Sequence, residues 1–438
     1  MTKAGHFGEP VNCARSQLIM SVPVVDVWGP VAPGTRSSFP PAPEAHDEWA
    51  LGGGTAWVYY SPLNRRQLIR PVILSDGFSS GSSNLDQLWH GLEENGDYRF
   101  ISELHAAGRD VIILGYTDRT ASITANADTA IECIRRAVAE RVGRAKLAVG
   151  GFSMGGLVTR YALAKMEQDP ALPDHETDLY FSYDTPHQGA WFPIAIQAFT
   201  HFATDNWGDT PGIGPVLRQF SGLLNSPAAK QMARWHIEKA DATPEQASER
   251  VAFLRALDEV GGWPRNLRKI GVANGKDTGA GNGIKAGATA VRCDGDTLHD
   301  TWLKTQAQGD QEVARLQKTG AEPVSVRTSG LPEIDGAPGG LFTVPSPAGD
   351  TGSFGLAAML MGLLGNTVNP DVITTSCFIP SISAVAAGDI NDPEALYRPI
   401  TPDHSALDAF TCAGRNEGHT TMTEQLGAWI VNEIVAAG

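Results

Sequence analysis

One serine stands between glycines in a pattern that suits nucleophilic catalysis. Residues 151–155 (Gly-Phe-Ser-Met-Gly) fit G-x-S-x-G, the nucleophile elbow. An apolar run at residues 147–149 precedes the motif, and a helix-like segment at residues 157–166 follows it. A side chain two positions before or after the serine would collide with neighbouring backbone, which explains both glycines. The pattern therefore predicts that Ser153 lies on a sharp strand-to-helix turn that exposes its hydroxyl.

A serine hydroxyl becomes a good nucleophile only when a base takes its proton, so a histidine must come within hydrogen-bond reach of Ser153. Among eleven histidines, His419 is the first choice because it follows the last strand-like region and precedes the final helix. This position agrees with the chain order serine, acid, histidine of triads that are built on this elbow. His404, which lies in a similarly late loop, is the reserve candidate.

Strand-like and helix-like segments alternate along the chain, which favours a mostly parallel, doubly wound α/β sheet. Residues 29–54 are expected to form a loop because they are rich in proline, glycine and serine. The predicted strands are residues 18–28 (an edge strand, because it contains Pro23), 55–60, 71–74, 110–116, 147–149, 178–183 and 267–273, with further strand-like residues at 372–385. The predicted helices are residues 84–94, 98–107, 123–142, 157–166, 191–202, 214–224, 228–238, 244–260 and 423–435.

This order of segments predicts a core that is interrupted by two insertions. The Gly-, Thr-, Val- and Asp-rich stretch that follows the helical segments suggests β-hairpins with one apolar piece at residues 354–364. The expected parts are a first part of the core with the elbow (1–188), a helical insertion (189–265), a core strand (266–275), a β-rich insertion (276–371) and a last part of the core with His419 (372–438).

Composition predicts a globular protein. The chain has 438 residues, of which 42% are apolar and 19% charged, and its formal net charge of −15 argues against nucleic acid as a partner. It has no uninterrupted apolar run of about 18 residues and no apolar signal-peptide core near Met1, so we expect a cytoplasmic protein without a membrane span. Five scattered cysteines without a C-x-x-C pair favour free thiols, and nothing requires a metal or an organic cofactor.

The motifs in this order resemble the α/β-hydrolase fold, particularly its lipases and esterases, over most of residues 71–435. Residues 184–189 (Asp-Thr-Pro-His-Gln-Gly) are similar to the Gly-Thr-Pro-His-x-Gly of bacterial lipases. Residues 378–384 (Phe-Ile-Pro-Ser-Ile-Ser-Ala) look like the x-Val-Pro-x-x-Ser-Ala segment of such lipases. The late residues 416–419 (Asn-Glu-Gly-His) complete the resemblance.

Two positions depart from the lipase pattern. Asp76-Gly77 stands where lipases usually have His-Gly after the oxyanion strand. Residues 376–377 (Ser-Cys) stand where these enzymes often have an acid. Within the Thr-Pro-His motif, we expect His187 to orient its loop rather than to take part in the reaction.

The resemblance also implies an oxyanion hole, which needs two preorganised N–H donors. The implied donors are the backbone amides of Phe78 and Met154. Because the backbone supplies both of them, the replacement of histidine by Asp76 is compatible with the hole, although a carboxylate there would repel nearby negative charge.

Four aspartates are candidates for the acid that orients the histidine. Asp184 ends the strand that follows the nucleophile strand and is the first choice, whereas Asp277, at the more usual position of the family, is the second. Asp296 resembles the Asp-Gly-Asp of some acyltransferases, and Asp408 closely precedes His419. Each of the four also suits a plain turn, where aspartate is a favoured residue.

The helical insertion, residues 189–265, is a candidate lid. Its apolar residues repeat with approximate helical spacing, and they either pack on the core or contact an acyl chain: Phe192, Ile196, Phe199 and Phe202, flanked by Trp191 and Trp207. Residues 354–364 either add to the same cavity or form plain core.

The leading hypothesis for function is a serine hydrolase that cleaves a carboxylic ester with a sizeable apolar part through an acyl-enzyme on Ser153. A thioesterase, cyclase or acyltransferase would use the same triad, because the acceptor depends on how well the closed site excludes water. The third hypothesis is a non-catalytic binding protein with the hydrolase fold.

Overall fold

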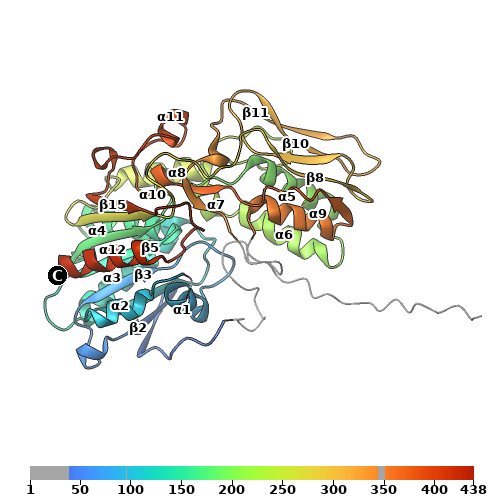
Figure 1. Ribbon diagram of the computed structural model, residues 1–438. Helices are drawn as coiled ribbons and strands as arrows, with labels where there is room; N and C mark the ends of the chain where they lie inside the picture. Colours follow the sequence, from blue (N-terminus) through green and yellow to red (C-terminus); the bar gives the residue numbers. More distant parts are fainter. Residues whose placement is uncertain (1–38, 95, 344–350) are drawn as a thin grey trace, which may run out of the picture.

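The computed structural model describes residues 39–94, 96–343 and 351–438, and a mostly parallel sheet forms its centre (Figure 1). Eight strands lie in the order β1-β2-β4-β3-β5-β6-β7-β15. Their bounds are β1 Asp47–Leu51, β2 Gly54–Tyr59, β3 Pro71–Ser75, β4 Asp110–Tyr116, β5 Leu147–Phe152, β6 Thr177–Tyr183, β7 Arg268–Ala273 and β15 Ala409–Cys412. From β4 to β15 all neighbours are parallel, whereas β1 and β2 join by antiparallel pairing. The predicted parallel α/β sheet is confirmed.

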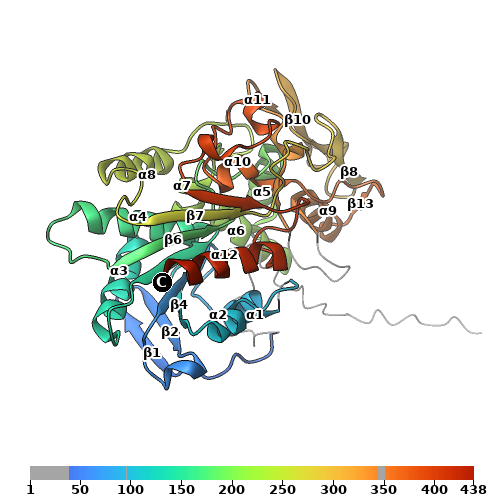
Figure 2. The ribbon, with the colours of Figure 1, turned by 60° about the vertical axis from the view of Figure 1, so that its left-hand side comes forward.

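Helices cover both faces of this sheet, because alternate residues of its buried strands pack in two separate cores. Val72 and Leu74 of β3 share one core with α1 (Leu85–Glu93), α2 (Phe100–Ala106) and α12 (Glu424–Ala437). Ile73 faces the other core, with α3 (Ile123–Glu140) and α4 (Met154–Gln168). Figure 2 shows α12 and α2 together on one face, with α3 on the other.

A second layer of helices and strands lies beside the central sheet (Figure 1). Its helices are α5 Ile194–Trp207, α6 Ile213–Leu224 and α9 Ser353–Leu363, whereas α7 (Pro227–Met232) and α8 (Ser248–Glu259) pack against each other nearer the central sheet. An antiparallel sheet has the order β11-β10-β9-β8-β13, with β8 Thr289–Gly295, β9 Thr301–Lys304, β10 Gln311–Leu316, β11 Val324–Thr328 and β13 Asn366–Val368. A separate pair, β12 (Gly339–Leu341) with β14 (Cys377–Pro380), connects this layer to the core.

The structure corrects several predicted elements. The expected loop at residues 29–54 contains β1, which forms a hairpin with β2 through Gly52 and Gly53. Strand β15 was not predicted, because four residues are too short for a periodic signal. The predicted strand at residues 18–28 lies outside the described residues.

Three further elements have bounds that differ from the predicted ones. Helix α7 ends at Met232, because the backbone then turns extended and His236 pairs with Glu245. Helix α5 begins only after Pro193, which has no N–H for a preceding helical turn. The strand-like residues 372–385 divide into β14 and a short helix, α10 (Ser381–Ala384).

None of the helices in the described ranges combines the length and the apolar character that a membrane span requires. The described cysteines carry free, buried thiols: Cys133, Cys293, Cys377 and Cys412.

Candidate active site

Ser153 occupies a strained turn between β5 and α4. Its backbone has φ 52° and ψ −123°, a conformation that L-residues rarely adopt and that persists only where the surroundings hold it. A Cβ on Gly151 would lie 2.4 Å from the carbonyl carbon of Gly155, and a Cβ on Gly155 would lie 2.4 Å from the carbonyl oxygen of Asp76. Both flanking glycines are therefore required by the close approach of backbone, as the motif predicts.

Two backbone segments adjoin the serine side chain. Met154 is the first residue of α4, and the N–H of a first helical residue has no partner within its helix. On the other side, a Cβ on Gly77 would lie only 3.3 Å from the Cβ of Ser153. Phe78 follows directly and is 5% exposed. The structure thus brings both predicted oxyanion segments to the serine.

A buried hydrogen bond between a histidine and an aspartate lies at the same edge of the sheet. His419 Nδ1 is 2.6 Å from Asp184 Oδ2, and the two side chains are 14% and 0% exposed. Asn274 donates its backbone N–H to the other carboxylate oxygen at 3.0 Å. In the described part of the chain, His419 Nε2 has no hydrogen-bond partner. This pair leaves one nitrogen of a fixed imidazole available for proton transfer.

Strand β12 holds the loop that carries His419. Leu341 donates its N–H to Glu417 O and accepts one from His419 N, each at 2.8 Å. A Cβ on Gly340 would lie 2.0 Å from Asp184 Oδ2, so only glycine lets this strand pass the carboxylate. No site residue was predicted at residues 339–341, where the Pro-Gly-Gly run before Leu341 is the available signal.

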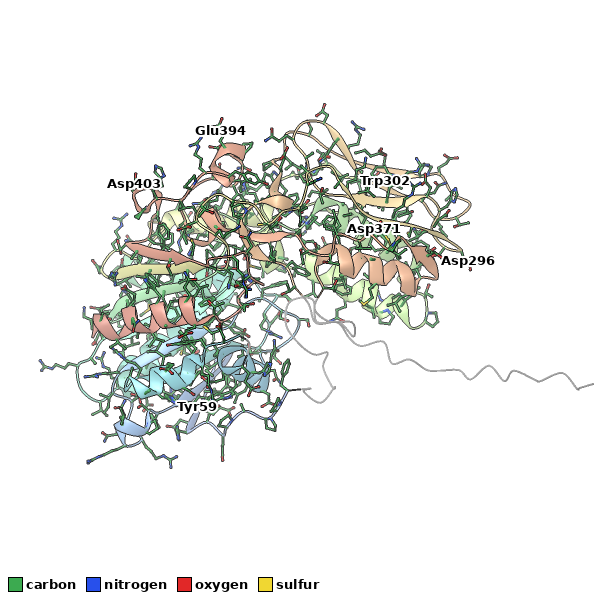
Figure 3. The ribbon with its side chains drawn as sticks, in the orientation of Figure 1. Tyr59, Asp296, Trp302, Asp371, Glu394 and Asp403 are labelled. Carbon is green, nitrogen blue, oxygen red and sulfur yellow. The ribbon has the colours of Figure 1, made fainter. Side chains whose placement is uncertain are left out.

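The other predicted acids lie elsewhere. Asp277 is exposed, and Asp408 accepts hydrogen bonds from the N–H and Nζ of Lys269. Asp296 is exposed at the outer edge of the antiparallel sheet (Figure 3). Among the described residues, Asp184 alone is hydrogen-bonded to the His419 side chain.

The reserve base also lies away from the pair. His404 is exposed at the end of a short 3-10 helix, Pro402–His404, where it bonds Thr401 Oγ1. Its neighbour Asp403 lies at the periphery of the molecule (Figure 3). The structure does not bring His404 to Asp184.

His187 is buried below the Asp184 loop and is engaged on both ring nitrogens. Nε2 lies 3.1 Å from Ser182 Oγ, and Nδ1 lies 3.4 Å from Arg160 Nη1. Burial lowers the pKa of His187 well below its usual value, and the Arg160 charge acts in the same direction. Trp263 packs against both side chains. These contacts agree with a structural role in which His187 orients its loop.

Asp76, the residue before Gly77, is buried with Arg119. Arg119 Nη1 is 3.7 Å from Asp76 Oδ2, while the other carboxylate oxygen accepts the Gly77 N–H at 2.6 Å. Arg119 Nη2 also donates to Ser80 O at 2.8 Å. Burial raises the pKa of Asp76, and Arg119, the Ser83 hydroxyl and the Gly77 N–H oppose that rise. This network holds the loop that carries Phe78.

Replacing Arg119 with methionine is expected to destabilise the protein by roughly 3 kcal/mol, because it leaves the Asp76 carboxylate buried without its cation. Urea unfolding measures this loss. The double variant Asp76→Asn/Arg119→Met is the control, since it removes the charge as well, and it should recover most of the lost stability. Equal stability of the two variants would show that charge pairing does not hold this loop.

Two small apolar cavities lie among the helices beside the site. The inner cavity reaches the site, because its walls include Phe78 and Phe378, and the Phe378 ring packs 4.9 Å from the His419 ring. It encloses about 30 Å³, enough for one water molecule. The outer cavity encloses about 10 Å³ between α5, α6 and α9, and it shares Phe192 and Leu224 with the inner one.

Some apolar residues of the helical segment line these cavities, and others pack within the protein. Phe192, Ile196 and Phe199 line the outer cavity, and α9 forms its opposite wall. Trp191 is buried and donates Nε1–H to Asp335 Oδ1 at 2.8 Å, so its role is structural. Phe202 packs against the Trp207 ring.

No family model matches the chain, and no curated protein matches its sequence. The chain is similar in structure to the mature form of the lipase BlEst2 of Bacillus licheniformis, at 14% identity, over 52% of this chain and 74% of that one, with a TM-score of 0.31. An esterase of Pyrobaculum calidifontis aligns at 14% identity over 52% and 67% of the two chains, with a TM-score of 0.32. Lipase B of Aspergillus fumigatus aligns at 14% identity over 57% and 49%, with a TM-score of 0.30. These partial likenesses leave function to be argued from the geometry of the chain itself.

Proposed function

We propose that the protein is a serine hydrolase that cleaves a carboxylic ester with a sizeable apolar acyl or alcohol part. The observation that carries the proposal is the buried 2.6 Å contact between Asp184 and His419 at the sheet edge where the elbow exposes Ser153. A strained serine and an oriented imidazole with a free nitrogen are the two parts that acyl transfer requires.

In the proposed reaction, His419 Nε2 takes the proton of Ser153 as Oγ attacks the ester carbonyl carbon. Asp184 keeps the Nδ1 proton in place and stabilises the imidazolium that forms. The backbone amides of Phe78 and Met154 stabilise the negative charge that develops on the carbonyl oxygen. When the tetrahedral intermediate collapses, the alcohol leaves with the proton from His419 and an acyl-enzyme remains.

Water then resolves the acyl-enzyme by the same steps in reverse. His419 takes a proton from the water, the hydroxide oxygen attacks the acyl carbon, and Ser153 leaves as it recovers its proton. The reaction uses no group outside the chain apart from ester and water.

The apolar preference of the proposal follows from the walls of the inner cavity, which begin at the oxyanion loop and continue onto the helical segment. A cavity of about 30 Å³ has no room for an acyl chain, so α5, α6 and α7 must move outward when substrate enters. In this proposal, residues 189–265 act as the lid.

A fluorophosphonate probe tests the proposal, because it forms a phosphonyl ester only with an activated serine. We expect intact-mass analysis to find one adduct on the wild-type protein and none on Ser153→Ala. Ser325→Ala, which changes an exposed serine on β11, is the matched control and should label like the wild type. An unlabelled wild type, or equal labelling of Ser153→Ala, would exclude the catalytic role of Ser153.

A further inference from the structure

One polar side chain of the inner cavity is left without a partner. His236 lines this cavity, is 3% exposed, and its Nε2 is buried without a hydrogen bond to any described residue. The other polar lining side chain, Gln197, is fully satisfied: its amide donates to Phe192 O and Trp235 O, and its oxygen accepts the N–H of Ile237. His236 therefore offers the one free hydrogen-bonding side chain of this wall among the residues that the structure describes.

A buried water held by the lining side chains alone would not be satisfied here. An ordered internal water makes two to four hydrogen bonds, whereas the side chains around this cavity offer one. A buried imidazole nitrogen without a partner is unfavourable, because it has lost its hydrogen bond to water and gained none in exchange. An alanine or leucine at position 236 would avoid that cost, so the geometry favours a ligand group that pairs with Nε2 when the cavity is filled.

The charge state of His236 narrows the kind of group that it can bind. Burial lowers the pKa of His236 to about 4, and the nearby charges of Lys230 and His201 act in the same direction, against Glu238 and Glu249. The imidazole is therefore neutral near pH 7, and a neutral imidazole has one donor and one acceptor. It suits an uncharged hydroxyl or keto oxygen better than a carboxylate.

The position of the cavity relative to Ser153 indicates which part of the substrate carries the hydroxyl or keto oxygen that His236 would bind. An acyl group on Ser153 would have its carbonyl oxygen at the Phe78 and Met154 amides, and its chain would enter the cavity that Phe78 and Phe378 border. His236 forms part of the wall of the same cavity.

We infer that His236 is a specificity-determining residue that hydrogen-bonds a hydroxyl or keto oxygen within the acyl chain, so that the preferred substrates are esters of acids that carry such an oxygen on their chain. The inference rests on the proposed function. It adds a polar requirement to a pocket that is otherwise apolar.

The test compares ethyl octanoate with the ethyl esters of 3- to 7-hydroxyoctanoic acid, with acid release followed by titration against enzyme-free blanks. We expect the wild type to prefer one hydroxy isomer over octanoate by about tenfold in kcat/KM, because the plain chain leaves Nε2 unpaired. In His236→Phe, which keeps the ring volume without the nitrogens, this ratio should fall to about one.

Two variants show whether the effect belongs to the hydrogen bond. His236→Gln retains a donor and an acceptor and should keep most of the preference, whereas Met232→Leu alters the cavity wall without polar atoms and should leave the ratio unchanged. Thermal unfolding and fluorophosphonate labelling confirm that each variant is folded.

The failures of the two proposals are distinguishable. If the wild type hydrolyses octanoate and every hydroxy isomer at equal kcat/KM, or if His236→Phe keeps the preference, the role of His236 is excluded and the proposed hydrolase stands. If the labelled serine is Ser153 but none of the esters is cleaved, hydrolysis of these octanoate esters is excluded together with this inference, while the nucleophilic role of Ser153 stands.

Discussion

Replacing Ser153 with glycine is expected to abolish turnover and, at the same time, to stabilise the protein. Loss of the nucleophile should lower kcat on the order of a millionfold, to the residual level that the rest of the site supports. The native φ of 52° costs a non-glycine residue about 1–3 kcal/mol, whereas glycine adopts it freely. After about 0.5–1 kcal/mol of added chain entropy in the unfolded state, we expect a net gain of about 1 kcal/mol in the free energy of unfolding.

Ser153→Ala is the control that separates the two effects. Alanine removes the hydroxyl but keeps Cβ, so turnover should fall as far as in Ser153→Gly while the backbone strain remains. Kinetics with a chromogenic ester and urea unfolding of the three proteins measure both quantities. A glycine variant that is less stable than the alanine variant would show that the elbow stores no strain.

Exchange of Asp184 for asparagine is expected to lower kcat by about 10⁴-fold with little loss of structure. An amide at this position would donate to His419 Nδ1, which then carries no proton, and the proton would move to Nε2. A protonated Nε2 cannot accept the Ser153 proton. Stopped assays at pH 7 and the labelling rate with the fluorophosphonate probe measure the effect.

Asp277→Asn is the matched control, because it makes the same change in an exposed aspartate that follows the neighbouring strand β7. We expect its kcat to stay within about twofold of the wild type, as for a surface position outside the site. Near-wild-type rates for both variants would leave His419 without an orienting acid and would contradict the proposed triad. Equal, large losses in both would assign part of the role to Asp277.

Local chemistry was sufficient to predict the elbow and most of the sheet. The glycines around Ser153 are required by close backbone contacts within a few residues or with the adjacent strand. A pentapeptide motif is therefore enough to predict the elbow. Strand β4 has the predicted bounds because it is buried on both faces and reads as a continuous apolar run. Strands β1 and β15 were missed because short edge strands have no such run.

The assembly of the site depended on contacts between distant segments. Asp184 and His419 are 235 positions apart, and the sequence offered four aspartates that each suited a turn. Strand β12, which follows the hairpins of the predicted β-rich insertion, is what brings Asp184 rather than another aspartate to His419. Its Leu341 is hydrogen-bonded to the loop around His419, and its Gly340 lies against the Asp184 carboxylate. No local pattern reports such a convergence.

The sequence by itself determined the parallel α/β sheet and the position of Ser153, because both follow from periodicity and from backbone crowding within a short stretch of chain. Only the tertiary structure decided that Asp184 meets His419, that Arg119 accompanies Asp76, and that His236 borders the cavity beside the serine. In each case a side chain meets a group that lies far from it in the sequence. Which polar groups meet in the buried interior depends on how all the helices and strands pack together.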